Sequence, residues 1–386
     1  MTDGRQGHML RIGIQVDFAG AYGRGVLRGV MRYANQKGNW EFVMPPMYSL
    51  RSSRTMDPHA ADGVIAMLHD PRSVAPFRRA RVPVVNTART VAPQELRRLG
   101  VPSVLPDDAV VGELAFQYFA DRGFRSFGFC GHPRAAWSLQ RCDAFRRACD
   151  ARGDGTTFSH VAAADRVPRE WIVSLPRPCA VLAANDRYAW HAIDACREIG
   201  VSVPEDIAVL GVDNDVLLSD MVRPTLSSMM IPAEQIGFEA ARVLDDMLQG
   251  KRAPKEPVLL PPHSVVTRHS TDVLSIEDPD VAEAAKFIRE NASHPLTVQN
   301  VLDCVSMSRR NLERRFKRVM KRSLLDEIRR VHLDRATRLL RETDLDMPRV
   351  AEQSGFASPI RFSTVFKEMT GVAPSIYRRK HRQGMG

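Results

Sequence analysis

Hydrophobic and polar residues alternate in two different ways along this chain, and the change comes near residue 280. Before that point, short apolar runs are separated by longer amphipathic stretches, which is typical of parallel β-strands joined by helices. We expect strands at Ile12–Val16, Gly63–Met67, Val82–Asn86, Ser126–Cys130, Ala180–Ala183 and Ile207–Val212, and helices at Gly25–Gln36, Asp108–Arg122, Ser138–Ala151, Arg187–Ile199 and Ala233–Leu248. A break at Gly123-Phe124-Arg125 divides them into two βα halves, so we predict an α/β fold of two doubly wound parallel-sheet subdomains.

The remainder of the chain has a purely helical pattern in two similar blocks. In the first block, Thr297–Val305 is followed by a turn at Ser306-Met307 and by a helix that Ser308 caps and that runs to Met320. In the second, a helix from Asp346 to Ser354 is followed by a turn at Gly355-Phe356 and by a helix from Ser358 to Met369. Two short helices that meet across a tight turn form a helix-turn-helix, so the blocks predict an all-α double helix-turn-helix domain.

Apolar residues between the two blocks recur at helical spacing and predict a helix that holds the blocks apart: Leu324, Leu325, Ile328, Val331, Leu339 and Leu340. Prolines and short polar residues precede the helical region and indicate a connection between domains. We therefore expect a sensor domain at 9–270, a linker at 271–280 and a DNA-binding domain at 281–386.

The chain's net charge of +10 lies entirely in the helical region. Residues 281–386 contain 22 Lys and Arg against 12 Asp and Glu, and residues 1–280 are balanced. A neutral domain joined to a basic one indicates that the second binds a polyanion, which we take to be a double-stranded DNA operator.

The second helix of each block carries side chains that can read base edges, because Arg pairs with guanine and Asn with adenine. The candidate DNA-binding residues are Ser308, Arg309, Arg310, Asn311, Glu313, Arg314 and Lys317 in the first block and Ser358, Arg361, Ser363, Thr364 and Lys367 in the second. We assign phosphate contacts to Arg315, Arg318, Lys321 and Arg322. A solvated helix surface is the alternative for each single charge.

Polar residues follow several predicted strands of the first region. Doubly wound sheets bind ligands beyond the carboxyl ends of their strands, and Asp and Asn there suit the hydroxyls of a polyol. The candidates by position are Asp17, Asn185, Asp186, Asp213 and Asn214, with Tyr22, Trp137, Tyr188 and Trp190 as rings that could cover a sugar face. For Asn185 and Asp186, helix capping is the alternative.

The C-terminal motif resembles that of AraC-type transcription regulators. The residues that carry this resemblance are Ala351-Glu352, Gly355-Phe356, Ser358, Phe362-Ser363, Phe366-Lys367, Gly371, Pro374 and Tyr377-Arg378. The chain departs from that family at Ser306 and Lys321, where glycine is common, and at Thr364, where arginine is common.

The preceding region resembles lactose-repressor-type and periplasmic sugar-binding domains through "VLAANDRYAWHAI", "VPEDIAVLGVDN" and "RPTLSSMMIPAEQIGFEAARVLDDMLQG". This resemblance implies a periplasmic-binding-protein-like sensor whose inducer contacts fall on Arg141, Asn185 and Asp213. The order of the two parts, joined by "RHSTDVLSIEDPDV", resembles the xylose operon regulators. That resemblance implies a homodimeric activator of carbohydrate catabolism genes that senses xylose or a related monosaccharide and, as an activator, works with RNA polymerase.

Two alternatives remain from other classes. Cys130 beside His132 could mark a thiol-dependent enzyme, although no third orienting group can be named. A transported sugar-binding protein is the other, but the polar start Met1–Arg11 has no signal-peptide core, so we expect a cytoplasmic protein without membrane contact. The six cysteines show no metal-ligand spacing and no GxGxxG loop is found, so we expect no cofactor, no metal and no enzymatic activity.

Overall fold

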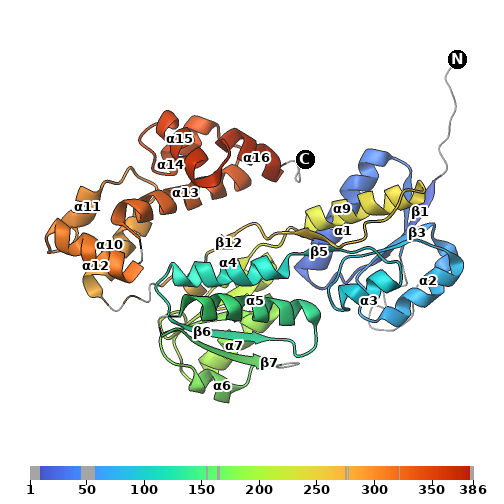
Figure 1. Ribbon diagram of the computed structural model, residues 1–386, viewed down its shortest axis with the longest axis horizontal. Coiled ribbons are helices and arrows are strands. Elements are labelled where there is room, and N and C mark those ends of the chain that lie inside the picture. The colour runs from blue at the N-terminus through green and yellow to red at the C-terminus, as the bar shows by residue number, and fades with distance from the viewer. Residues whose placement is uncertain are drawn as a thin grey trace. The chain divides into compact units, whose positions relative to one another are not determined.

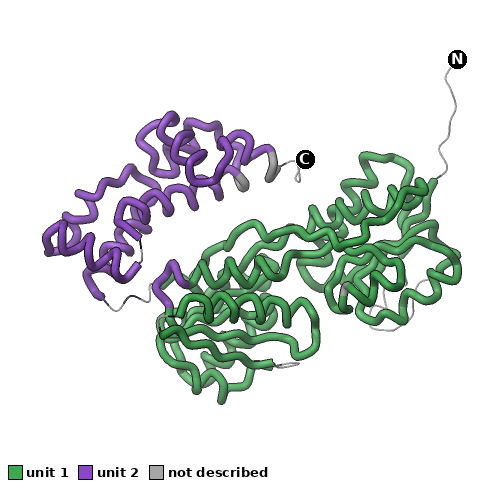
Figure 2. Tube along the Cα trace, in the orientation of Figure 1, with its two compact units in different colours: residues 1–119, 125–273 green, residues 120–124, 274–386 purple. Residues whose placement is uncertain are grey.

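The computed structural model describes residues 9–44, 57–153, 155–162, 166–273, 276, 278–320 and 322–382. Their contacts divide the chain into two compact units, which Figure 2 shows in different colours. Unit 1 comprises residues 1–119 and 125–273, and unit 2 comprises residues 120–124 and 274–386. The division at 273 lies close to the predicted linker, whereas nothing in the sequence indicated that residues 120–124 belong to unit 2.

Unit 1 contains two larger sheets whose strands are mostly parallel (Figure 1). The first has the order β2-β1-β3-β4, the second has the order β12-β10-β9-β8-β6-β7, and β5 pairs separately with β11. Among the described strands, the β10–β12 pairing is the antiparallel one. The strands are β1 (Leu10–Gln15), β2 (Trp40–Val43), β3 (Gly63–Ala66), β4 (Val84–Asn86), β5 (Val104–Pro106), β6 (Ser126–Gly131), β7 (Thr157–Ala162), β8 (Cys179–Ala183), β9 (Ile207–Val212), β10 (Ser227–Met229), β11 (Val258–Leu260) and β12 (Val265–Val266).

Helices cover both faces of the six-stranded sheet, as a doubly wound fold requires. The crossovers β6-α5-β7 and β8-α7-β9 run in opposite directions across this sheet, so right-handed connections place α5 and α7 on opposite faces (Figure 1). Every residue of β8 and β9 is buried, which explains their uninterrupted apolar sequences. The helices of unit 1 are α1 (Ala21–Lys37), α2 (Ala75–Ala80), α3 (Pro93–Arg98), α4 (Asp108–Ala120), α5 (Ala136–Arg152), α6 (Arg169–Ser174), α7 (Asp186–Glu198), α8 (Val216–Met221) and α9 (Ala233–Leu248).

The expected division of unit 1 at Gly123 is confirmed for the two larger sheets, since the strands of the first precede Gly123 and those of the second follow it, but it is wrong for the helices. Helix α4 already packs on α5, since a Cβ on Gly112 would lie 2.6 Å from the carbonyl oxygen of Arg141. Helix α9 returns to the first sheet, where it packs against α1, β3, β4 and β5. The α1–α9 contact is close because a Cβ on Gly29 would lie 1.9 Å from the carbonyl oxygen of Glu234. The two subdomains therefore exchange chain segments, so neither is one continuous half of the sequence.

Unit 2 consists of helices around two hydrophobic cores that share one long helix, α13. Leu324 and Ile328 of α13 lie in the first core, and Ala336 and Leu340 lie in the second. The predicted linking helix is thus present, and Leu325, one of the residues that predicted it, is exposed. The helices are α10 (Pro279–Glu290), α11 (Val298–Asp303), α12 (Arg309–Met320), α13 (Leu324–Glu342), α14 (Met347–Gln353), α15 (Pro359–Thr370) and α16 (Pro374–Arg382).

The two helix-turn-helix turns of unit 2 differ in backbone conformation. Gly355 has φ +77°, and a Cβ there would lie 2.6 Å from Nε2 of His332. In contrast, Ser306 is not among the non-glycine residues with positive φ in the described chain, so it does not incur the cost of about 1 kcal/mol that a left-handed conformation imposes on such a residue. Lys321, the other position where that family commonly has glycine, lies outside the described residues.

A buried ion-pair cluster, defined by Glu327 and its neighbours Arg322, Arg330 and Asp121, lies inside unit 2. Glu327 is fully buried and lies 2.7 Å from Arg322 and 2.8 Å from Arg330. Asp121 in turn lies 2.8 Å from Arg322. These pairs explain why the short segment 120–124 belongs to unit 2.

Candidate functional site

A cavity of about 250 Å³ lies in unit 1 at the carboxyl ends of strands from both sheets. Its position follows from the fold, because this edge is where parallel sheets leave room between successive βα loops. The lining residues are Asp17, Gly20, Tyr22, Gly23, Met67, His69, Ala88, Arg89, Thr90, Pro106, Asp108, Trp137, Arg141, Asn185 and Asp213. Carboxylate, guanidinium, amide and ring groups thus converge on one small space.

Asp108 organises the guanidinium groups of this cavity. Its carboxylate is buried and lies 2.8 Å from Nε of Arg141 and 3.1 Å from Nε of Arg89. Burial raises the pKa of Asp108, while the two guanidinium groups oppose that shift. Arg141 also donates to the carbonyl oxygen of Ala184 at 2.6 Å and lies over the Trp137 ring at 5.2 Å. The Arg141 side chain is therefore held in place before any ligand arrives.

Three further side chains complete the polar lining. Burial, together with the nearby Asp108 carboxylate, raises the pKa of Asp213 to about 6, although Arg141 opposes the shift. Asn185 caps α7 by accepting a hydrogen bond from the Tyr188 amide at 3.1 Å. Tyr22 donates to the carbonyl oxygen of Thr87 at 2.6 Å. Asn185 therefore combines the capping role with a place in the cavity wall.

The structure brings together five of the predicted ligand-binding residues, namely Asp17, Tyr22, Arg141, Asn185 and Asp213. Asp186 and Asn214 do not line this cavity. The Asp186 carboxylate accepts hydrogen bonds from the Ser228 hydroxyl and from the Asp215 amide, which steadies the loop after β9. The Asn214 side chain accepts from Arg268 at 3.1 Å.

Of the four candidate rings, Tyr22 and Trp137 line the cavity, whereas Tyr188 is buried elsewhere and Trp190 is exposed. Sequence reasoning missed His69, Arg89, Thr90 and Asp108 as lining residues. The rule that polar residues after a strand line the cleft could have indicated His69, Arg89 and Thr90, since they follow β3 and β4. Asp108 was interpreted only as the first residue of a helix.

The predicted DNA-binding residues lie on the solvent side of α12 and α15. Both helices bury one face, with Leu312 and Phe316 in the first and Phe362 and Phe366 in the second. The candidate residues are exposed or half-buried throughout. Ser358 caps α15 by accepting from the Arg361 amide at 3.2 Å. The two second helices therefore expose these polar side chains, and their N-terminal turns are accessible.

Two of the expected phosphate-binding residues have partners within unit 2. Arg315 lies 3.0 Å from Asp280 and also pairs with Asp278. Arg322 belongs to the buried ion-pair cluster. We therefore correct the assignment of these two residues, whose charge is already paired, while Arg318 is exposed. Lys321 lies outside the described residues.

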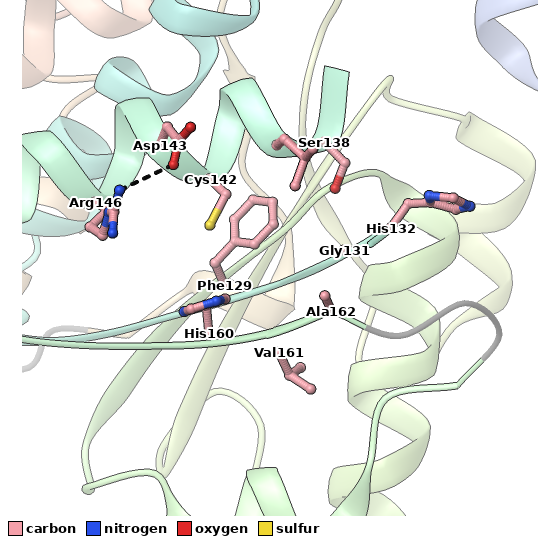
Figure 3. Close-up of a pocket in the computed structure, with 11 residues that line it drawn as sticks. Phe129, Gly131, His132, Ser138, Cys142, Asp143, Arg146, His160, Val161 and Ala162 are labelled. Atoms are coloured by element: carbon pink, nitrogen blue, oxygen red, sulfur yellow. Dashed lines mark hydrogen bonds and ion pairs between the residues drawn. The ribbon is translucent and has the colours of Figure 1, made fainter. Parts of the chain in front are cut away.

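A second cavity, of about 120 Å³, lies between β6, β7 and α5 and is lined by His132 and Cys142, but not by Cys130 of the thiol-enzyme alternative (Figure 3). Figure 3 shows the Cys142 thiol near the Phe129 ring, with His132 at the other end of the cavity. Burial raises the pKa of Cys142 to about 11 and raises the pKa of the buried Cys130 still further. An activated thiol needs a lowered pKa, so neither cysteine supports enzymatic activity.

Neither a metal site nor a membrane span is found in the described parts of the chain. Within those parts, no group of three or more His, Cys, Asp or Glu side chains could hold a metal ion. No helix there combines the length and the apolar character needed to cross a bilayer.

Comparison with known families agrees with both units. A periplasmic binding protein-like domain model matches residues 116–271, and a helix-turn-helix domain model matches residues 301–380. The solved structure of a xylose-binding transcription activator has a TM-score of 0.60 at 28% identity and covers 96% of this chain and 98% of its own. A regulator in complex with cellobiose covers 68% of this chain with a TM-score of 0.56 at 24% identity, which supports the sensor fold alone.

Curated relatives match almost the whole chain. The xylose operon regulatory protein of Escherichia coli K12 is 30% identical over 93% of this chain and 94% of its own length. That of Haemophilus influenzae is 29% identical over 92% of this chain and 95% of its own length. With its sensor followed by a helix-turn-helix domain, this chain belongs to the family of xylose operon regulatory proteins, which are DNA-binding transcription regulators.

Proposed function

We propose that this regulator binds an uncharged pentose, with xylose as the first candidate, in the 250 Å³ cavity of unit 1. The observation that carries the proposal is the convergence of Asp213, Asn185 and Arg141 on that cavity. Carboxylate, amide and guanidinium groups form directed hydrogen bonds to hydroxyls, and the Trp137 ring can cover the apolar face of a sugar. The names of the relatives and of the similar solved structure favour xylose.

The charges that line the cavity favour a neutral ligand. Asp17, Asp108 and Asp213 face Arg89 and Arg141, and Asp108 is already paired with both guanidinium groups. A phosphorylated sugar would bring two negative charges toward guanidinium groups that are not free to receive them. We therefore expect free sugars to bind and sugar phosphates to be rejected.

Titration calorimetry on the full chain tests the ligand proposal with D-xylose, D-ribose, L-arabinose and D-glucose. We expect D-xylose to bind most tightly and Asp213→Ala to reduce its affinity at least tenfold. Asn214→Gly is the matched control, because Asn214 lies next in the chain, outside the cavity, and its φ of +51° suits glycine. Unchanged xylose affinity in Asp213→Ala would refute this assignment of the cavity.

The proposal extends to operator binding by a cytoplasmic homodimer. A two-fold dimer presents paired helix-turn-helix modules, so the ligand controls transcription through its differential affinity for two arrangements of the protein. Light scattering with and without D-xylose measures the molar mass, and a monomer under both conditions would contradict the dimer. Transcription in vitro with RNA polymerase distinguishes activation, which we expect, from repression.

A further inference from the structure

The two second helices of unit 2, α12 and α15, present different chemistry on equivalent faces. Their buried residues define a common register, since Leu312 and Phe316 of α12 correspond to Phe362 and Phe366 of α15. In this register, Arg310 of α12 corresponds to Ile360 of α15. The position that offers a guanidinium group in the first block therefore offers an aliphatic side chain in the second.

Ile360 is 81% exposed, more than any other large hydrophobic residue for which exposure is described. It precedes Phe362 by two residues and so lies about 200° around the helix from that buried ring. The exposed Ile360 side chain thus stands at the centre of the outward face of α15, in its first turn. Recognition helices contact base edges with these N-terminal residues.

The neighbouring residue on this face strengthens its apolar character. Thr364 lies one turn further along α15, and its hydroxyl donates to the carbonyl oxygen of Ile360 at 3.1 Å. Because that hydroxyl is engaged within the helix, it is less available for a base edge. In α12 the equivalent residue is Arg314.

We propose that Ile360 is a specificity-determining residue that recognises the 5-methyl group of a thymine in the operator. The inference rests on the operator binding proposed above. The major groove offers an apolar group only at thymine, and aliphatic side chains contact it there. The operator segment that α12 contacts is therefore recognised through hydrogen bonds. The segment that α15 contacts is recognised in part through the methyl groups of thymine.

The test begins with the full-length protein and a randomised duplex library, from which the wild type selects its preferred site. Each thymine of that site is then replaced singly by deoxyuridine, which removes the methyl group and keeps the base pair. We expect one such replacement to weaken wild-type binding about fourfold, the value for one carbon transferred from water. The Ile360→Ala variant should bind the original site more weakly and no longer distinguish thymine from uracil at that position.

Two control variants distinguish thymine recognition by Ile360 from a general effect on DNA binding. Met369→Ala changes another exposed apolar residue of α15, near its far end, and should keep the thymine preference. Arg310→Ala should lose base preference at a different operator position and keep the thymine preference in the segment that α15 contacts. Binding assays and thermal denaturation together show whether each variant is folded.

The outcomes are distinct. An undiminished thymine preference in Ile360→Ala overturns the inference, and so does a wild type that is insensitive to every uracil replacement. If the wild type enriches no sequence at all, the operator binding on which the inference rests is itself refuted.

Discussion

Asp213 is a cavity residue whose charge depends on the other charged groups of the sensor cavity. It follows β9 with φ +108°, and the loop that begins there is held by the Asp215 amide, which donates to Asp186 at 2.7 Å. Asp213 lines the cavity together with Arg141 and Asp108, whose charges act on its carboxylate in opposite senses. Since burial raises its pKa to about 6, Asp213 changes charge within the range of pH in which the protein can be studied.

We therefore expect sugar affinity to increase with pH through about 6. Protonation removes acceptor capacity from Asp213, so affinity should fall by up to about tenfold for each pH unit below that value. Calorimetry between pH 5 and 8 measures this, with Asp213→Asn as control. That variant should bind weakly at every pH, and a flat wild-type profile would contradict the role of the carboxylate.

Gly355 shows how a single backbone position supports unit 2. It combines φ +77° with a site where a Cβ would lie 2.6 Å from Nε2 of His332 and 2.7 Å from the carbonyl oxygen of His294. We expect Gly355→Ala to reduce the free energy of unfolding by about 2–4 kcal/mol, since steric overlap adds to the cost of the left-handed conformation.

Gly371→Ala is the matched control for Gly355→Ala. Gly371 has φ +76° but has no atom within 4 Å of a Cβ position, so this variant should lose only about 1 kcal/mol. Differential scanning calorimetry of the full chain compares the two. Equal losses of unfolding free energy would show that the atoms around Gly355 move to accommodate a methyl group.

At the level of elements, α13 contributes to both cores of unit 2 and carries Glu327 and Arg330 of the ion-pair cluster. Glu327 is fully buried, while Asp334, which also pairs with Arg330, is 64% exposed. Salt bridges with Arg330 and Arg322 overcome the effect of burial and lower the pKa of Glu327. Its contribution to stability is present above the unfolded pKa and is lost as the pH falls through the lower folded value.

We expect Glu327→Gln to destabilise unit 2 by about 3–5 kcal/mol, because the half-buried guanidinium groups of Arg322 and Arg330 would lose a fully buried counter-charge. Asp334→Asn removes a carboxylate from the same helix and the same arginine, but at an exposed position, and should cost less than about 1 kcal/mol. Urea denaturation of the full chain compares the variants. Similar losses of unfolding free energy in the two variants would indicate that burial does not determine how much these ion pairs stabilise the protein.

For the whole molecule, DNA binding and sugar binding are expected in parts of the chain that differ in net charge. Residues 281–386 carry the net charge of +10, and the sensor cavity offers partners for an uncharged ligand. Duplex binding that neutralises several phosphates releases counterions, whereas binding of a neutral sugar does not.

We expect the affinity for the selected duplex to fall on the order of 10³-fold between 50 and 200 mM salt, for about six phosphate contacts. Sugar affinity should stay constant over the same range. Fluorescence anisotropy and calorimetry on one preparation measure both. A duplex affinity that does not respond to salt would argue against a basic footprint.

Local patterns in the sequence determined most elements of this protein. The apolar run Ile207–Val212 predicted a strand and Ser358-Pro359 predicted the start of a helix, and both are present, because capping and the spacing of apolar residues act locally. The same locality left α4 and α9 in the wrong subdomains, since a turn signal shows where an element ends and not which sheet a helix packs against.

Tertiary structure alone decided which residues meet. Asp108 is an ordinary helix start in the sequence, and only the approach of Arg89 and Arg141 makes it the centre of the cavity. Likewise, only folding brings Asp121 to Arg322, because an ion pair over 201 residues of separation leaves no local pattern. The sequence therefore determined the chemistry available at each position, and the packing of distant segments determined which of those groups act together.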